Sequence, residues 1–194
     1  MFAKEFMKVL EQYPDGTLFV DLFGGSGLLS HITKSLKPHS TVIYNDFDNY
    51  RFRMKHIPQT NQLLADIREM VGNSVPRHKI IKGELRERIF SRIEQEENTT
   101  GYVDFITLSS SILFSMKYKL SVQDMRKEAL YNNIRKTSYP ECTDYLEGLE
   151  IVSCDYKEVF NRYKDIPGVV FLVDPPYLST DVGTYNMYWN MADY

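Results

Sequence analysis

Cysteine is scarce in this sequence, and long apolar runs are absent. The 194 residues include two cysteines, Cys142 and Cys154, without a CxxC spacing and without clustered histidines beside them. This pattern argues against a zinc site, and free thiols suit a reducing compartment. No stretch approaches the ~20 apolar residues that cross a membrane, and the first residues lack the pattern of a secretory signal. We therefore expect a cytoplasmic protein with no metal site and no membrane span.

A net positive charge is also lacking. The formal net charge of −3 argues against a uniformly basic nucleic-acid binder. Two stretches are nevertheless basic, because residues 77–92 and residues 117–136 each contain six lysines and arginines against two acidic residues. Each stretch suits contact with nucleic-acid phosphates, or else it forms a solvated helix face. Charge alone favours the solvated face.

The composition is that of a globular protein, with 43% hydrophobic and 25% charged residues. A chain of this length accommodates one α/β domain with a large insertion. The pattern predicts helix, strand, helix and strand at residues 3–13, 17–23, 27–36 and 41–44. Helical segments follow at residues 61–71, 84–97, 103–117 and 121–135, and then strand, helix and strand at residues 149–152, 156–163 and 169–173. The opening order predicts a parallel sheet with right-handed crossovers.

These elements divide the chain into two parts. We expect residues 1–59 and 147–194 to form the core of an α/β, Rossmann-like fold, and residues 60–146 to form a helical insertion. Four aromatic residues of the insertion are expected in its core rather than on a binding surface: Phe105, Phe114, Tyr118 and Tyr131.

A glycine-rich turn follows the first strand, in the segment Asp21-Leu22-Phe23-Gly24-Gly25-Ser26-Gly27. Glycines permit a tight turn and let a ligand approach the backbone closely. Asp46 follows the second strand, where an acid binds the ribose hydroxyls of dinucleotides. Together they predict an adenosine-containing cofactor across the carboxyl ends of the strands. The alternative is a purely structural glycine turn.

The last predicted strand runs directly into Asp174-Pro175-Pro176-Tyr177. Two consecutive prolines remove two backbone donors and fix φ, so this segment offers only carbonyl and carboxylate acceptors. Such a corner suits an amino group that has two hydrogens to donate.

The glycine turn and the Asp-Pro-Pro-Tyr segment together resemble the motifs of the D12 class of N6-adenine-specific DNA methyltransferases. The resemblance implies S-adenosylmethionine as cofactor and double-stranded DNA as partner. Cys154-Asp155-Tyr156 is similar to a Gly-Asp-Phe segment of that family, with Cys154 in place of the glycine. The implied cofactor-binding residues are Asp21, Phe23, Gly24, Gly25, Ser26, Gly27, Asp46, Phe47, Asp155 and Tyr156. The implied catalytic residues are Asp174, Pro175, Pro176 and Tyr177.

The resemblance also implies a mechanism. Asp174 would accept one hydrogen of adenine N6 and the Pro175 carbonyl the other, which localises the nitrogen lone pair toward the cofactor's methyl group. The adenine has to be flipped out of the duplex, and Tyr177 would stack on it. The order of the motifs places the target-recognition region in the insertion.

Three other functions stay open at this point. The Pro-Pro-Tyr corner fits any planar amine, so RNA or a protein glutamine are alternative methyl acceptors. A non-catalytic module that binds cofactor or DNA is another possibility. A nicotinamide-dependent dehydrogenase is disfavoured, because nothing in its chemistry requires Asp-Pro-Pro-Tyr.

A complete sheet of this family has more strands than the pattern predicts here. We therefore expect the chain to be the first part of a methyltransferase, with weak or absent activity by itself. An apolar sheet edge should lie beside the strand that ends at Asp174. That edge is expected to be exposed or covered by a partner, such as a second copy of the chain.

Overall fold

The computed structural model describes residues 2–114 and 117–175 and divides the chain into two compact units. Unit 1 consists of residues 1–54 and 142–194, and unit 2 consists of Lys55–Glu141. Unit 2 begins five residues before the predicted insertion of residues 60–146 and ends five residues before its predicted end.

Unit 1 is an α/β unit built on one parallel sheet. Its strands are β1 (Phe19–Asp21), β2 (Val42–Asn45), β5 (Glu150–Val152) and β6 (Val170–Leu172), arranged in the order β5-β2-β1-β6 with every pair parallel. Its helices are α1 (Phe2–Glu11), α2 (Leu28–Leu36), α3 (Tyr50–Lys55), which ends where unit 2 begins, and α8 (Tyr156–Tyr163). The predicted Rossmann-like fold with a parallel sheet is therefore confirmed, while α3 was not predicted.

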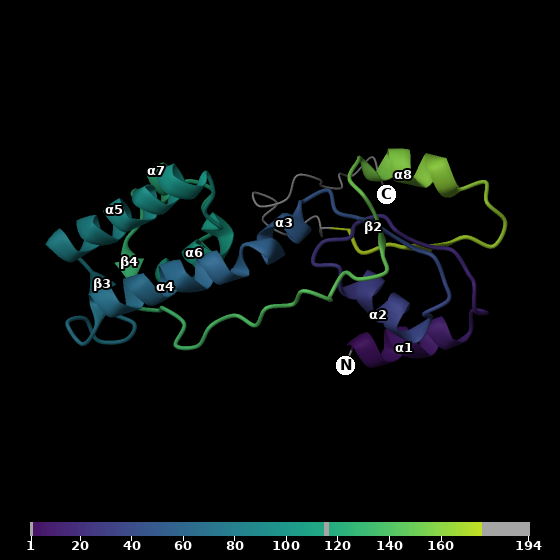
Figure 1. Cartoon of the computed structure of the whole chain (residues 1–194), viewed down its shortest axis with the longest axis horizontal. Coiled ribbons are helices and arrows are strands. Elements are labelled where there is room, and N and C mark those ends of the chain that lie inside the picture. Colours follow the sequence, from purple (N-terminus) through teal and green to yellow (C-terminus); the bar gives the residue numbers. More distant parts are fainter. Residues whose placement is uncertain (1, 115–116, 176–194) are drawn as a thin grey trace. The chain divides into compact units, whose positions relative to one another are not determined.

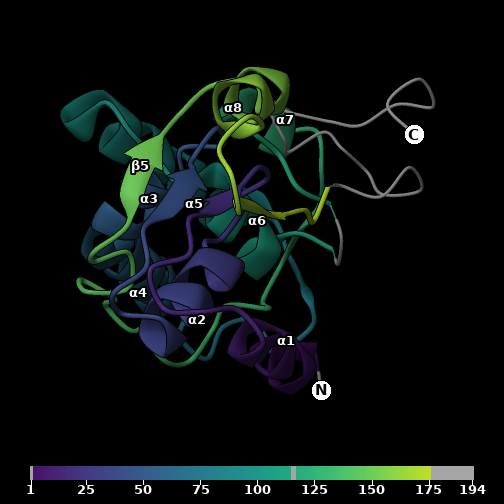
Figure 2. The same ribbon diagram turned by 90° about the vertical axis from the view of Figure 1, so that its right-hand side faces the viewer.

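Helices cover both faces of this sheet, with α1 and α2 on one face and α8 on the other (Figure 1, Figure 2). Side chains alternate along each strand, so neighbouring residues enter different cores. Phe19 and Val42 belong to the core cluster with Leu10 of α1, whereas Val20 and Ile43 pack in the cluster that contains Val159 of α8. Burial on both faces explains why the first two strands read as continuous apolar runs.

Unit 2 is mainly helical. Its elements are α4 (Ile57–Val71), β3 (Ile80–Ile81), α5 (Gly83–Thr100), α6 (Phe105–Ile112), α7 (Val122–Met125) and β4 (Leu130–Tyr131). They enclose one apolar core cluster, with Ile67, Ile89 and Leu108 among its fully buried members.

The helix predicted at residues 121–135 is wrong beyond its first turn. The helix α7 ends at Met125, and the chain then forms β4, which pairs antiparallel with β3 through Ile81↔Leu130. Both of these side chains are fully buried. Burial in the core of unit 2 therefore outweighs the local helical pattern, which carries no information about a distant strand.

The prediction that four aromatic residues lie in the core is confirmed for Phe105, while Tyr131 is only partly buried. Phe105 is buried, but Phe114 is 58% exposed and Tyr118 is 41% exposed. The reason is that α6 ends at Ile112, before the predicted end at residue 117. Both residues therefore lie beyond the helix face that would have carried them into the core.

The strand β6 lies at one side of the four-stranded sheet, where β1 is its neighbour among the described residues. Val173, which follows it, is 49% exposed. A partner at this edge stays a prediction. Among the described residues, no helix is long and apolar enough to cross a membrane.

Candidate functional site

The turn after β1 requires glycine at two positions, Gly24 because of its close neighbours and Gly27 because of its backbone conformation. A Cβ atom added to Gly24 would overlap the ring of Tyr44 and lie 2.5 Å from the Asn45 carbonyl oxygen. Gly27 has φ 76 and donates its N–H to the Gly24 carbonyl over 2.7 Å, and α2 begins directly after it. These glycines are therefore required by geometry, as the sequence predicted for a turn of this kind.

Tyr44 of β2 supports the glycine turn through a hydrogen bond to its backbone. Its fully buried hydroxyl lies 2.9 Å from the Gly25 carbonyl oxygen and 3.1 Å from Asp46 Oδ1. Burial and the neighbouring Asp46 carboxylate raise the pKa of Tyr44, so the hydroxyl stays protonated and donates. Sequence reasoning missed this residue, because a tyrosine in an apolar strand carries no distinctive signal.

Asp21 is a buried carboxylate at the end of β1, with 1% of its surface exposed. Ser30 of α2 donates to its Oδ2 over 2.7 Å, while Oδ1 has no hydrogen bond of normal geometry within the described residues. Burial raises the pKa of Asp21 to about 6 against the hydrogen bond from Ser30, and the charge of Asp174 raises it further. A buried carboxylate oxygen that lacks a hydrogen-bond partner is suited to bind a positively charged group of a ligand.

Asp46 lies at the end of β2 and is 4% exposed. Its Oδ1 accepts the Tyr50 N–H over 2.5 Å and its Oδ2 accepts the Arg51 N–H over 3.2 Å, so the carboxylate anchors the start of α3. A carboxylate has about four lone-pair positions, so Oδ2 keeps capacity for another donor. The predicted ribose contact has to use that remaining capacity.

Asn45, the residue before Asp46, is 1% exposed and fully hydrogen-bonded. Its Nδ2 donates to the carbonyl oxygens of Leu22 and Cys154, each over 2.9 Å, and its Oδ1 accepts the Cys154 N–H over 3.1 Å. Sequence reasoning missed Asn45 as well. Its position directly before Asp46 at a strand end was the available signal.

The segment after β5 contributes Asp155 and Tyr156. Asp155 begins α8, and its Oδ1 accepts the Lys157 N–H over 2.8 Å. The ring of Tyr156 packs against Phe23 with centroids 4.8 Å apart. Phe47 packs in the same core cluster as these two rings. The predicted aromatic residues thus come together from three strand ends.

Asp174 lies level with the glycine turn. The ladder between β1 and β6 ends at Asp21↔Leu172, and the Leu22 N–H donates to the Leu172 carbonyl over 3.1 Å. Asp174 follows two residues later and is exposed, and Pro175 is half-buried. The predicted residues Pro176 and Tyr177 lie outside the described residues. One edge of the sheet therefore gathers the turn, Asp46, Asp155 and Asp174.

The sequence matches the family of D12 class N6 adenine-specific DNA methyltransferases over residues 2–194. This chain belongs to that family. It is also 37% identical over 200 residues to a Haemophilus influenzae protein named "Putative methyltransferase", and the alignment covers 100% of this chain and 67% of that protein. The resemblance drawn from the glycine turn and from Asp-Pro-Pro-Tyr is thereby confirmed, and the protein is a methyltransferase. Its family generally uses S-adenosylmethionine.

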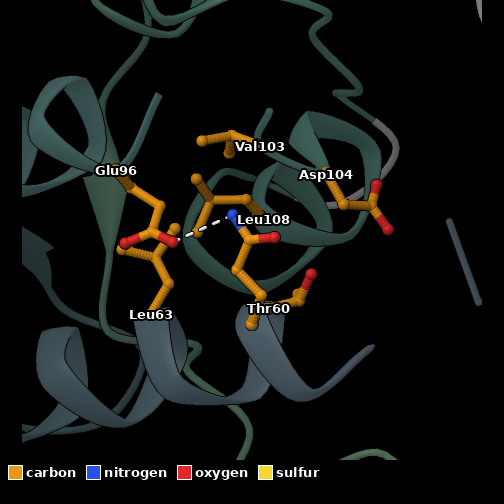
Figure 3. A pocket seen from close by; sticks show the side chains of 7 residues that line it. Thr60, Leu63, Glu96, Val103, Asp104 and Leu108 are labelled. Atoms are coloured by element: carbon orange, nitrogen blue, oxygen red, sulfur yellow. Dashed lines mark hydrogen bonds between the residues drawn. The ribbon is translucent and has the colours of Figure 1, made fainter. Parts of the chain in front are cut away.

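A pocket of this methyltransferase lies within unit 2 and is lined by residues of that unit. Leu63, Val103 and Leu108 line it together with Glu96, Asp104, Gln59 and Thr60 (Figure 3). Gln59 Nε2 already donates to Glu96 Oε1 over 2.9 Å and contacts the Tyr102 carbonyl at 3.0 Å. Asp104 accepts the Thr107 N–H and begins α6. We assign this pocket to helix packing. Over residues 2–114 and 117–175, no cluster of acidic, histidine and cysteine side chains suits a metal ion.

Most cations of the two basic stretches are used inside unit 2 of the methyltransferase. Arg92, for example, forms ion pairs with Asp66 and Glu96, both over 2.8 Å. The other engaged cations are Arg77, Arg86, Lys117, Lys119, Arg126, Lys127 and Arg135. Four exposed side chains of these stretches make no ion pair or hydrogen bond within the described part of the chain: Lys79, Lys82, Arg88 and Lys136.

Proposed function

We propose that this protein transfers a methyl group from S-adenosylmethionine to N6 of an adenine flipped out of double-stranded DNA. The observation that carries the proposal is the placement of Asp174. It follows β6, which pairs with β1, and, beyond the effect of burial, its charge raises the pKa of Asp21, the residue with which the glycine segment begins. An acceptor for an amino group therefore lies next to a turn suited to a cofactor.

The residues at this edge fit S-adenosylmethionine. The turn has no room for a side chain at Gly24 and disfavours one at Gly27 through its positive φ, so a ligand approaches its backbone, and Asp21 Oδ1 is suited to the cofactor's ammonium group. The helix α2 begins without a side-chain cap and without an acidic residue in its first turn, which favours the cofactor's carboxylate there. Asp46 and Asp155 would hold the ribose and the adenine. When bound, the cofactor supplies a methyl group made electrophilic by the positive sulfonium.

The methyl acceptor is held by the end of β6. Asp174 is exposed, so its carboxylate is open to an incoming N6 amino group, and the Pro175 carbonyl would take the second hydrogen. Holding both hydrogens out of conjugation localises the lone pair and aligns it with the methyl group. Extruding the base costs a few kcal/mol, and stacking on Tyr177 would return about 1–3 kcal/mol.

Unit 2 is proposed as the target-recognition region, as predicted for residues 60–146. Lys79, Lys82 and Arg88 support this, because they are exposed cations that make no ion pair or hydrogen bond with the residues that the structure describes. Uncompensated charges of this kind favour contact with phosphates. The cations already paired inside the unit are assigned to its stability.

Two measurements test the proposal together. Calorimetric titration should show that S-adenosylmethionine binds, and that Asp46→Ala weakens binding. Incubation with labelled cofactor and duplex DNA should place label on N6 of adenine, while Asp174→Ala keeps cofactor binding and loses transfer. Label on RNA or on protein glutamine, with none on DNA, would contradict the proposed substrate.

A further inference from the structure

We infer that Asn45 is a positioning residue that holds together three segments facing the cofactor. They are the turn after β1, the end of β2 with Asp46, and the segment after β5 with Asp155. This inference rests on the proposed function, because it assigns those segments to the cofactor site. Asn45 itself is buried under the strand ends, so it acts through the backbone groups that it binds.

The first step is the location of its partners. In the sheet order β5-β2-β1-β6, Asn45 on β2 lies between β1 and β5. On one side its Nδ2 donates to Leu22, which begins the turn after β1. On the other side it makes two hydrogen bonds to the backbone of Cys154, directly before Asp155. The side-chain amide therefore continues the hydrogen-bonded ladder across β2, beyond the last paired residues of the strands.

The second step is that this line of hydrogen bonds reaches β6. Leu22 accepts from Asn45 with its carbonyl oxygen and donates its N–H to Leu172 over 3.1 Å. Leu172 lies two residues before Asp174. A chain of hydrogen bonds therefore runs from Cys154 through Asn45 and Leu22 to Leu172, and it links all four strand ends.

The third step is that only an asparagine side chain meets these requirements. Two carbonyl oxygens need two N–H donors, and the Cys154 N–H needs an acceptor, which together match one primary amide. An aspartate of the same shape keeps the acceptor but loses both donors and faces two carbonyl oxygens at close range. A buried carbonyl without its donor is costly, so the two loops would move apart to find other partners.

The test compares Asn45→Asp with Val42→Ala. Val42 lies on the same strand and is fully buried, but it packs on the side of α1 and α2. Both substitutions should lower thermal stability. We expect Asn45→Asp to weaken S-adenosylmethionine binding about tenfold or more, because it loses the two donated hydrogen bonds and a tenfold change corresponds to about 1.4 kcal/mol. Val42→Ala should leave the affinity unchanged. Equal affinity for Asn45→Asp and wild type would overturn the inference.

Hydrogen exchange followed by mass spectrometry provides a readout that does not need the cofactor. In Asn45→Asp, exchange should accelerate together in residues 22–27 and 153–156, and in Val42→Ala it should stay slow in both. Acceleration confined to residues around 45 would overturn the inference. If the wild type fails to bind S-adenosylmethionine, the proposed cofactor is wrong, while the exchange comparison still decides whether Asn45 links the segments.

A second variant guards against misfolding of Asn45→Asp. Asn45→Gln keeps the amide and its neutrality, but the extra methylene displaces the donors and the acceptor. It should weaken cofactor binding and accelerate exchange in the same two segments. Wild-type behaviour of Asn45→Gln in both measurements would show that the position of the amide does not matter, which contradicts the inference.

Discussion

The two units of this methyltransferase handle polar groups in opposite ways. Unit 1 buries Asp21, Asn45 and Asp46 at the carboxyl ends of parallel strands, and leaves one oxygen of Asp21 underused. Unit 2 pairs most cations of its basic stretches, as Arg92 does with Asp66 and Glu96, and its buried carboxylate Asp104 accepts the Thr107 N–H. Burying polar groups is costly unless they are satisfied. We therefore place the proposed site at the strand ends of unit 1, where one oxygen of Asp21 lacks a hydrogen-bond partner among the described residues, whereas the charges of unit 2 mostly stabilise its own fold.

The largest contrast is expected between one aspartate of each unit. Asp174→Ala removes the acceptor for N6 and should slow methyl transfer about 100- to 1,000-fold, the usual loss for one group of this kind. Asp104→Ala removes the cap of α6 in unit 2 and should cost about 1 kcal/mol of stability. Single-turnover transfer and thermal unfolding measure the two effects. Equal transfer rates for the two variants would contradict the assignment of transfer to Asp174 and of a purely structural role to Asp104.

Two glycines sharpen the same comparison. Gly24→Ala introduces a Cβ that overlaps Tyr44, so it should cost about 1–3 kcal/mol and abolish cofactor binding. Gly101→Ala, at the end of α5, places its Cβ in open space at φ 74 and should cost about 1 kcal/mol. Chemical denaturation and calorimetry on both variants check this. Retained cofactor binding in Gly24→Ala would refute the role of the turn.

The pH dependence should have opposite signs in the two units. The pKa of Asp21 is raised to about 6, so the folded state binds its proton more tightly than the unfolded state, and stability falls as pH rises from about 4 to 6. Asp21→Asn should remove that loss, worth about 3 kcal/mol. In unit 2, Lys117 and Lys119 lower the pKa of Glu128, so its contribution is present at neutral pH and lost on acidification.

Thermal unfolding of Asp21→Asn and Glu128→Gln, followed from pH 7 down to about pH 3, tests these signs. Asp21→Asn should flatten the decrease between pH 4 and 6, and Glu128→Gln should flatten the loss of stability at lower pH. A wild-type profile in Asp21→Asn would show that this carboxyl titrates normally in the folded protein.

The smallest effect concerns DNA affinity. Lys79→Ala and Lys82→Ala should each reduce the dependence of log K on log salt by about 1, because each would remove one phosphate contact. Arg126→Gln should leave that slope unchanged, since Arg126 pairs with Glu87 and Glu94. Fluorescence anisotropy with a labelled duplex at several salt concentrations measures the slopes. A slope that is reduced for Arg126→Gln alone would contradict the assignment of Lys79 and Lys82 to phosphate contacts and of Arg126 to ion pairs within unit 2.

Local pattern was enough to predict the parallel sheet and most helices of unit 1. The apolar run at residues 17–23 and the glycines after it allow little besides a buried strand and a tight turn. The same approach was wrong for residues 126–135, where Leu130 joins β4 because Ile81 is there to pair with it. Pairing partners far apart in the sequence leave no local periodicity.

The sequence by itself determined the family and the glycine turn, and it proposed Asp174 as the acceptor, because each depends on residue types that are adjacent along the chain. Only the tertiary structure decided that Asp46 also anchors α3, that Tyr44 supports the turn, and that Asn45 joins Leu22 to Cys154. These roles arise where four strands end side by side. Hydrogen bonds there depend on distance and direction in space, which the order of residues does not specify.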